Sequence, residues 1–389
     1  MNDQQWAMIL LMKSAITGER YKLPESFSLE ESLPLIKKHH IITQIYDGAV
    51  TCGISQSEPA MQRLFQSYLR LLLITERQQA AIEQLRQAFQ TANIDHMLLK
   101  GSRMRKLYPK PELRYMGDAD ILIRVEQYDR IRPLMVELGY QKGTETKHEL
   151  PWSSSALYLE LHKCLIDPIH EDWYRHYGDG WKLATAVSGS EYAMKTEDEW
   201  IFMFIHFAKH FRGAGVGCRY VTDLWVWRRS HPDMDEGYIR RIMEQLQMDK
   251  FYNLMLRLID YWFADVAGDT VLDTMTRYIF DSGSWGTREE MAVSAVVMDQ
   301  SRSNHSVGGR GFVIRRALFP PMDQLRYEYP VLRKHIWLLP VIWLYRNFQK
   351  IFLKPNVLKR KLKDVQATTS EKVNAKQELL NLVGLDYHF

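Results

Sequence analysis

Apolar side chains recur at helical spacing through the first ninety residues of the chain. Between residues 61 and 91 they return every three or four positions, and polar residues fill the other face. The apolar positions of this stripe are Leu64, Tyr68, Leu72, Ile82, Leu85 and Phe89. The spacing predicts one long helix, and Ser28 followed by Glu31 is typical of a capped helix start before it. We therefore expect residues 1–90 to form an N-terminal helical region.

The pattern changes to short strand-like runs after residue 91. Residues 97–99 form a continuous apolar run that ends at Lys100, and apolar residues alternate with polar ones from Asp118 onward. An amphipathic segment at 128–138 is closed by Gly139, which is typical of the end of a helix. Two short strands are therefore predicted here, with a short helical segment at 103–108 between them and the helix at 128–138 after the second.

Two more strands are predicted at 140–149 and 155–165, with 151–154 as the hairpin connection between them. The order of strand, helix, strand, helix, strand, strand is typical of a small mixed sheet with helices on one face. We therefore predict an α+β fold, in which a small mixed β-sheet core at 91–170 carries extensive helical additions at both ends.

The rest of the chain is mostly helical in pattern. Residues 168–195 are rich in Trp, Tyr, His and Gly without periodicity, and we expect a loop region there, either beside the substrate or packed under a long loop. Broad apolar stripes predict helices at 197–212 and across 237–280. The expected domains are thus a C-terminal helical domain at 171–363 and a tail at 364–389.

Two aspartates mark the start of the second predicted strand. Asp118 and Asp120 are two positions apart, so strand alternation places both carboxylates on one face. Such a pair repels unless a cation lies between the two charges, and Mg²⁺ binds carboxylate oxygens while sharing them with substrate phosphates. Gly101 and Ser102 form a turn earlier in the same stretch, with Lys and Arg residues between. The combination indicates a site for a metal-bound triphosphate; two solvated surface aspartates are the plain alternative.

This stretch resembles the DNA polymerase beta-like nucleotidyltransferase superfamily, which is marked by Gly-Ser, a helix and a strand with Asp-x-Asp. It is more closely similar to a bacterial group, the uncharacterised nucleotidyltransferases, in which Lys-Gly, Tyr-Pro-x-Pro, Arg and Asp-x-Asp follow in this order. The matching residues are Lys100, Gly101, Tyr108, Pro109, Pro111, Arg114, Asp118 and Asp120. Ala119 stands where an aliphatic Ile is usual, and as a core-facing residue it should thin the packing without disturbing the ligands.

The resemblance also implies a third carboxylate on a later strand. Glu160 fits this position, because it lies between the apolar Leu159 and Leu161 and so faces away from the core. If that strand pairs beside the Asp-x-Asp strand, all three carboxylates point to the same side.

The activity implied by the resemblance is transfer of a nucleoside monophosphate from an NTP, such as ATP, to a hydroxyl, with pyrophosphate leaving. Asp118, Asp120 and Glu160 would be the catalytic residues and the ligands of Mg²⁺, with Mn²⁺ as the alternative. Nucleotide binding is assigned to Lys100, Gly101, Ser102, Arg103, Arg114, His206, Lys209, His210 and Arg219. The acceptor stays open between a sugar or lipid-linked glycan precursor, a small molecule, a tRNA end and a protein hydroxyl.

Two other interpretations compete with this one. His206 and His210 share a helix face and Asp223 follows, so the three could instead form the zinc or iron centre of a metal-dependent phosphohydrolase. The histidines could also be structural. The other competing interpretation is a catalytically silent nucleotide-binding or regulatory module, against which the presence of all three carboxylates argues.

The charge of the chain is uneven. The net charge is +4, which argues against a sequence-specific nucleic-acid binder, but residues 301–363 hold 14 Lys and Arg against Asp323 and Glu328. Aromatic and basic residues at 336–361 suit a helix lying on an anionic membrane, although the apolar run is too short to span one. A buried terminal helix with a solvated basic end is the alternative.

Three widely spaced cysteines, Cys52, Cys164 and Cys218, predict neither a disulfide framework nor a cysteine zinc site. The first eleven residues lack a basic segment and a cleavage site and are predicted to begin a helix. Both features favour a cytoplasmic protein.

Overall fold

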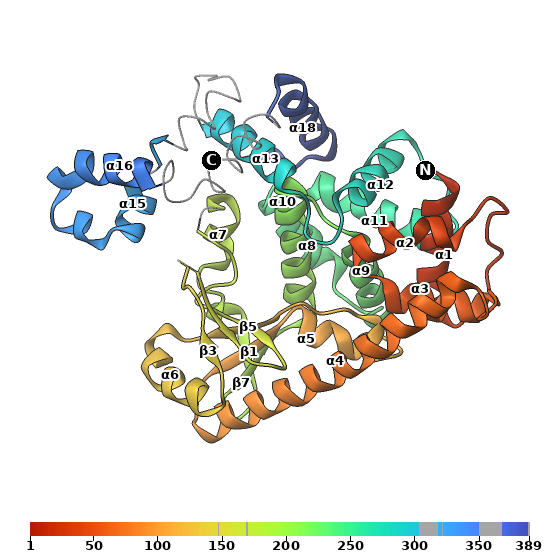
Figure 1. Ribbon diagram of the computed structural model, residues 1–389, viewed down its shortest axis with the longest axis horizontal. Helices are drawn as coiled ribbons and strands as arrows, with labels where there is room; N and C mark the ends of the chain where they lie inside the picture. Colours follow the sequence, from red (N-terminus) through yellow and green to blue (C-terminus); the bar gives the residue numbers. More distant parts are fainter. Residues whose placement is uncertain (147, 169, 303–317, 321, 350–367, 388–389) are drawn as a thin grey trace. The chain divides into compact units, whose positions relative to one another are not determined.

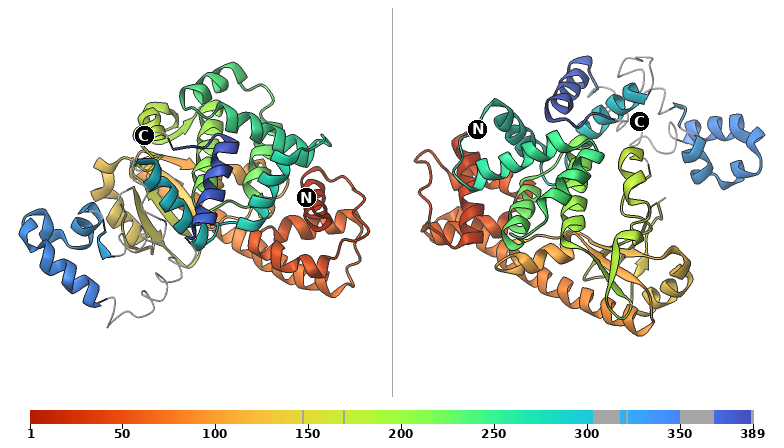
Figure 2. Two further views of the ribbon diagram at one scale, coloured as in Figure 1. Left: turned by 90° about the horizontal axis from the view of Figure 1, so that it is seen from above. Right: turned by 180° about the vertical axis from the view of Figure 1, so that it is seen from behind.

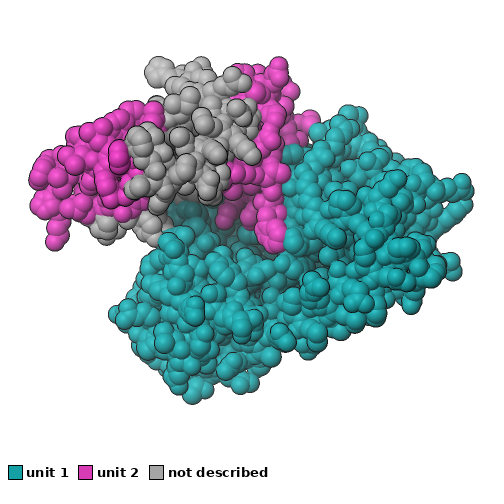
Figure 3. Space-filling view, viewed as in Figure 1, with its two compact units in different colours: residues 1–208, 216–284 teal, residues 209–215, 285–389 magenta. Residues whose placement is uncertain are grey.

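The computed structural model of the protein describes residues 1–146, 148–168, 170–302, 318–320, 322–349 and 368–387. The chain divides into two compact units, which Figure 3 colours separately. Unit 1 consists of Met1–Ala208 and Val216–Ser284, and unit 2 of Lys209–Gly215 and Trp285–Phe389. The predicted strands and the helices that precede them all belong to unit 1.

Four helices open unit 1: α1 (Asp3–Thr17), α2 (Leu29–His39), α3 (Ile42–Cys52) and α4 (Pro59–Thr91). The capped start predicted at Ser28 is confirmed, because its side chain accepts a hydrogen bond from the Glu31 N–H. The long helix predicted at 61–91 is α4, which runs along one side of the sheet (Figures 1 and 2). Its buried apolar positions include Leu64, Leu85 and Phe89.

Within the described residues, unit 1 contains a seven-stranded mixed sheet in the order β3-β4-β5-β2-β1-β7-β6. The strands are β1 (His96–Leu99), β2 (Ala119–Ile123), β3 (Gln141–Lys142), β4 (Glu149–Ser153), β5 (Tyr158–His162), β6 (Ala184–Ser188) and β7 (Glu191–Met194). Strand β2 lies antiparallel to β1 and parallel to β5. Helices and a mixed sheet in this arrangement confirm the predicted α+β class.

The two faces of the sheet differ in character. Alternate residues of β2 and β5, including Ala119, Ile121 and Leu159, are buried in one core with α4 and with α6 (Tyr128–Glu137). Because successive strand residues point to opposite faces, Asp120 and Glu160 are left on the other face. The sheet thus separates an apolar layer under α4 and α6 from a polar face.

The hairpin connection predicted at 151–154 is wrong. Pro151, Trp152 and Ser153 belong to β4, and the turn to β5 follows Ser153. Pro151 is tolerated because its missing N–H would point toward β3, and the ladder of β3 with β4 covers only Gln141 and Lys142. The Pro151 carbonyl points to the same side and accepts a hydrogen bond from the Gly143 N–H. Trp152 is fully buried against the α4 side of the sheet, which explains the apolar residue at this position.

The loop region predicted at 168–195 is also wrong. It contains α7 (Glu171–Tyr177), a 3-10 turn (Trp181–Leu183) and the strands β6 and β7. Strand β7 pairs in parallel with β1, so the sheet continues beyond residue 170. Several aromatic residues of this segment pack on one another, so their spacing does not show the two-residue period of a strand. The Trp181 ring, for example, lies edge-on to Tyr192, and the Arg124 guanidinium lies over its face.

Helices complete unit 1 after the sheet. They are α8 (Thr196–Arg212), α9 (Cys218–Ser230), α10 (Glu236–Gln245), α11 (Asp249–Phe263) and α12 (Thr270–Ser282). The stripe predicted for 197–212 is confirmed, since Trp200, Phe204 and Phe207 on α8 are all buried. The last residues of α8, from Lys209 on, are assigned to unit 2.

Unit 2 contains α13 (Arg288–Arg302), α15 (Met322–Glu328), the 3-10 turns Pro330–Arg333 and Ile336–Leu338, α16 (Leu339–Phe348) and α18 (Ser370–Val383). Helix α18 packs on α13, and the buried Lys376 ammonium donates to the carbonyl of Phe211 at the end of α8. None of the helices in the described residues is both long and apolar enough to cross a bilayer. Residues 350–361 of the predicted membrane-contact segment lie outside the described part of the chain.

His39 joins three helices of unit 1 and should make the stability of this unit sensitive to acid. Its Nε2 donates to the Phe280 carbonyl at 3.0 Å, and its Nδ1 accepts from the Cys218 N–H at 3.2 Å. Burial, only partly offset by the bond to Phe280, lowers its pKa to about 4 from the ordinary 6.5. The folded protein therefore resists protonation where the unfolded chain accepts it, so this contribution to stability is complete above pH 6.5 and is lost as the pH falls towards 4.

The expected size of this loss is about 3 kcal/mol in the free energy of unfolding. Denaturant unfolding at pH 7, 5.5 and 4.5 measures it, with His39→Gln as the comparison. The variant should be less stable at pH 7 and should lose less on acidification than the parent. Equal losses in the two proteins would show that His39 does not carry the effect.

Candidate functional site

The site is built on the tight connection from β1 to α5 (Gly101–Met104). Lys100 has φ +41° and ψ −111°, a conformation that L-residues rarely adopt, and its carbonyl accepts hydrogen bonds from the N–H groups of Arg103 and Met104. Gly101 is required next, because a Cβ there would lie 2.6 Å from Nη1 of Arg114 and 3.2 Å from Met116. The strained turn and the bare glycine bring the backbone of 100–101 close to the start of β2.

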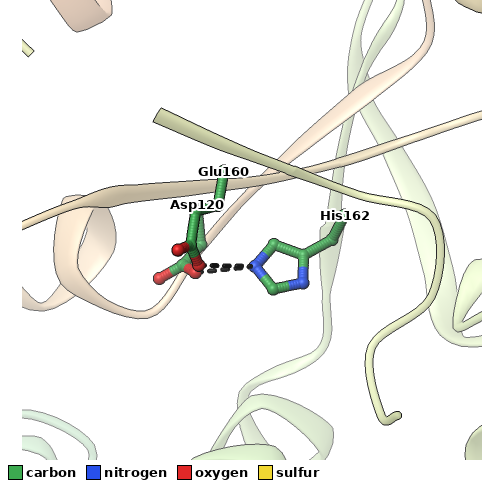
Figure 4. Close-up of side chains that lie close together, drawn as sticks. All are labelled: Asp120, Glu160 and His162. Atoms are coloured by element: carbon green, nitrogen blue, oxygen red, sulfur yellow. Dashed lines mark hydrogen bonds and ion pairs between the residues drawn. The ribbon is translucent and has the colours of Figure 1, made fainter. Parts of the chain in front are cut away.

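Strands β2 and β5 place Asp120 beside Glu160. The two residues are partners in the parallel register, so their side chains leave the sheet on the same face. Figure 4 shows their carboxylates and the His162 imidazole lying together. Each of the three groups offers a ligand atom within 4.8 Å of the others. Asp118 lies half-buried just before β2, close enough to influence the charge of both Asp120 and Glu160. The sequence prediction that Asp120 and Glu160 converge agrees with this geometry.

His162 is a member of this group to which the sequence reasoning gave no role. Its Nε2 lies 2.7 Å from Oδ1 of Asp120 and 3.8 Å from Oε2 of Glu160. The same strand alternation that selects Glu160 also selects the residue two positions later, so the signal was present. Burial lowers the pKa of His162, and the ring is therefore neutral near pH 7, with Nε2–H donating to Asp120.

The carboxyl groups of Asp118, Asp120 and Glu160 differ in the direction of their pKa shifts. Burial, followed by repulsion from Glu149 and the two aspartates, raises the pKa of Glu160 to about 8. Burial and Asp120 also raise the pKa of Asp118. Burial alone would raise the pKa of Asp120 too, but the Lys100 charge and the bond from His162 outweigh it and hold that pKa well below its usual range. One carboxylate is thus firmly ionised, and its neighbours would gain from a cation.

The donor set fits a divalent cation. Carboxylate oxygens are the ligands that Mg²⁺ and Mn²⁺ prefer, and two acidic groups with raised pKa values around a third ionised one are the arrangement that a metal charge relieves. Among the described residues, Asp120, Glu160 and His162 are the one group of this kind within reach of a single ion. A site on this face would therefore hold a metal through Asp120 and Glu160.

Comparison with known protein families decides what kind of protein carries this site. A family model described as an uncharacterised nucleotidyltransferase matches residues 25–264, which include the whole sheet and helices α8 to α11. The chain belongs to this family. No curated protein and no solved structure matches it. It is thus a nucleotidyltransferase, and the resemblance found in the Gly-Ser and Asp-x-Asp stretch is confirmed.

Two cations of the nucleotidyltransferase adjoin its carboxylates. Lys100 Nζ lies 3.1 Å from Oδ1 of Asp120, and both side chains are largely buried. Arg219 on α9 donates from Nη1 to the Tyr115 carbonyl at 2.9 Å, while its Nε is buried without a hydrogen-bond partner in the described part of the chain. The charges of Lys100 and Arg219 both act to lower the pKa of Asp118. Both charges therefore act on the carboxyl groups of this site.

Two other predicted nucleotide-binding arginines are engaged elsewhere. The Arg103 Nε lies 2.6 Å from the buried Glu199 carboxylate on α8. Arg114 donates to Asp223 on α9 through Nη2 at 2.9 Å, and the Tyr108 hydroxyl donates to the same carboxylate at 2.7 Å. In this structure these arginines fasten the turn at Lys100 and Gly101, and the residues after it, to α8 and α9.

The alternative zinc or iron centre would be formed by His206, His210 and Asp223, and two of these residues have contacts of their own. Asp223 is enclosed by Arg114 and Tyr108, and the ring of His206 lies beside Tyr220, whose hydroxyl is 3.5 Å from its Nε2. Lys209 and His210 belong to the end of α8 in unit 2.

Ser102, a predicted nucleotide-binding residue, is buried, and its Oγ lies 4.0 Å from the Met116 sulfur.

Proposed function

We propose that this nucleotidyltransferase transfers a nucleoside monophosphate from an NTP to a hydroxyl of an acceptor and releases pyrophosphate, in a reaction that depends on Mg²⁺. The observation that carries the proposal is the pairing of Asp120 with Glu160 on adjacent parallel strands, with Asp118 at the head of the first. Nucleotidyl transfer needs charge neutralisation of a triphosphate and activation of a hydroxyl, and three converging carboxylates around a divalent ion can provide both.

Asp118, Asp120 and Glu160 would hold the ion, which neutralises phosphate charge and lowers the pKa of the acceptor hydroxyl when bound. Alternatively, Glu160 would take the proton of the acceptor hydroxyl directly. Lys100 and Arg219 would bind the leaving pyrophosphate, and the N–H groups of Gly101 and Ser102 its oxygens.

His206, Lys209 and His210 on α8 remain proposed contacts of the triphosphate. Arg103 and Arg114 would contribute indirectly in the bound state, since each already has a buried carboxylate partner. His162 would act as the positioning residue that orients Asp120.

We propose an acceptor class that includes glycans and lipid-linked precursors at a membrane. Trp337, Val341 and Leu344 in and before α16 expose more than half of their surface, which suits a helix resting on a lipid surface. Basic residues continue the segment to residue 361.

The test is incubation of the full chain with each of the four labelled NTPs and Mg²⁺ or Mn²⁺, together with soluble glycan, tRNA and lipid-extract acceptor pools. Release of labelled pyrophosphate with label transfer to one pool is the expected result. Nucleotide binding without pyrophosphate release from any pool would favour a silent nucleotide-binding module. Release of inorganic phosphate alone, with loss in His210→Ala, would favour the phosphohydrolase.

A further inference from the structure

A cavity of about 240 Å³ lies between α4 and the segment that follows the turn at Lys100 and Gly101. Its lining comes from α4, β1 and α5 with the 3-10 turn Arg105–Leu107: Gln79, Ile82, Glu83, Arg86, Leu98, Ser102, Arg105 and Lys106. One water needs only about 10–15 Å³ of such space, so the cavity could hold a small organic molecule.

The cavity lies on the side of the sheet opposite the catalytic carboxylates. Leu98, which lines it, pairs with Ile121, and both belong to the core under α4. Leu99 is the partner of Asp120. Since neighbouring strand residues face opposite ways, the cavity and Asp120 lie on different faces of the sheet. A ligand in this cavity would therefore be distinct from the nucleotide.

Arg105 is the unusual residue of the lining. It is only 3% exposed, and its Nε and Nη2 donate to the Arg114 carbonyl and to Oε1 of Gln78. Nη1 is buried with no hydrogen-bond partner, and no carboxylate among the described residues forms an ion pair with this guanidinium. Burial, and then repulsion by Arg114 and Arg219, lowers the pKa of Arg105 to about 10. A buried charge without a counter-ion is costly, and an anionic ligand would remove the cost.

The other charged residues at the cavity leave a positive excess on this side. Lys106 is exposed and forms no ion pair within the described part of the chain. Arg86 forms ion pairs with both Glu191 and Glu83. Glu112 and Glu76 act on Arg105 only at longer range. Two cations, Arg105 and Lys106, thus line the cavity together with the apolar side chains of Ile82 and Leu98.

We propose that this cavity is a binding site for a small phosphate monoester. A phosphate group carries about −1.5 to −2 charges near pH 7, which suits the two cations of the lining, and its three acceptor oxygens suit a guanidinium and an ammonium together. A single carboxylate would leave one cation without a partner. The organic part of the ester would contact Ile82 and Leu98. Ser102 lines the cavity and directly follows Gly101 in the chain, so a bound ester would also restrain the turn at Lys100 and Gly101.

The test measures binding of inorganic phosphate and of glycerol phosphate to the full chain without nucleotide or divalent metal, by calorimetry, with glycerol as the uncharged comparison. We expect both phosphates to bind, glycerol phosphate more tightly, and glycerol not at all. Arg105→Gln and Lys106→Ala should each weaken binding about tenfold or more, the size expected for a lost bond to a charged group. Arg63→Ala on α4 removes an equal charge outside the cavity and should leave binding unchanged.

Absence of phosphate binding to the parent protein would overturn the proposal. Binding that is lost in Arg219→Gln but kept in Lys106→Ala would also overturn it, because the anion would then occupy the face of the carboxylates. If Arg105→Gln fails to fold, the exposed Lys106 decides alone. The readout requires no turnover, so its failure is separate from failure of the proposed transferase reaction.

Discussion

Asp120→Asn should reduce nucleotidyl transfer by about a thousandfold or more. Asn keeps the shape of the side chain but removes the charge that faces Lys100, His162 and the metal position beside Glu160. Because the other two carboxyl groups have raised pKa values, Asp120 is the main permanent negative charge of the group. Steady-state release of labelled pyrophosphate at saturating NTP and Mg²⁺ measures the effect.

The matched control is Asp95→Asn. Asp95 lies just before β1 and pairs with Arg124 at 2.6 Å, so the substitution removes the same charge from a surface ion pair of the same sheet. Activity in this variant should stay within about twofold of the parent, since such pairs contribute little. An Asp120→Asn protein that folds and retains parental activity would place the catalytic centre elsewhere.

Arg114→Met should lower the free energy of unfolding by about 3–5 kcal/mol, the cost of leaving a buried charge without its partner. Arg114 and Asp223 are both less than a tenth exposed, and the ion pair joins the segment before β2 to α9. The Tyr108 hydroxyl would remain as the one observed donor to Asp223, and it cannot neutralise the charge. Urea unfolding followed by circular dichroism gives the value.

A double-mutant cycle separates the ion pair from lost packing. Arg114→Met with Asp223→Leu should be more stable than Arg114→Met alone, because no buried charge is then left unpaired. Arg63→Met, which breaks the exposed pair with Glu30, should cost less than about 1 kcal/mol. If Arg114→Met cost no more than this surface variant, the buried pair would not hold the segment in place.

The two predictions test different parts of the same arrangement. Asp120 acts on the reacting groups, whereas Arg114 supports the turn, since its Nη1 occupies the space next to Gly101 that a Cβ would need. A stability loss in Arg114→Met accompanied by a small change in KM for NTP would agree with support of the turn. A rise in KM at unchanged stability would instead agree with direct phosphate binding by Arg114.

Local pattern in the sequence was enough to predict several parts of this protein. The helical stripe of 61–91 predicts α4, and the alternation of Leu159, Glu160 and Leu161 predicts which side chains of β5 are buried. Both follow from the backbone period alone, 3.6 residues for a helix and two for a strand. The Gly-Ser turn and the two aspartates were likewise visible, because residues near one another in sequence made the pattern.

Only the tertiary structure decided which elements and charges meet. That β5 lies beside β2, that β7 extends the sheet past β1, and that Arg103 and Arg114 are taken up by Glu199 and Asp223 all depend on segments up to about a hundred residues apart. The pattern of a strand fixes its faces but not its neighbours, and a long flexible arginine pairs with whichever carboxylate the packing brings near. For the same reason the unpaired Arg105 could be recognised only once its surroundings were known.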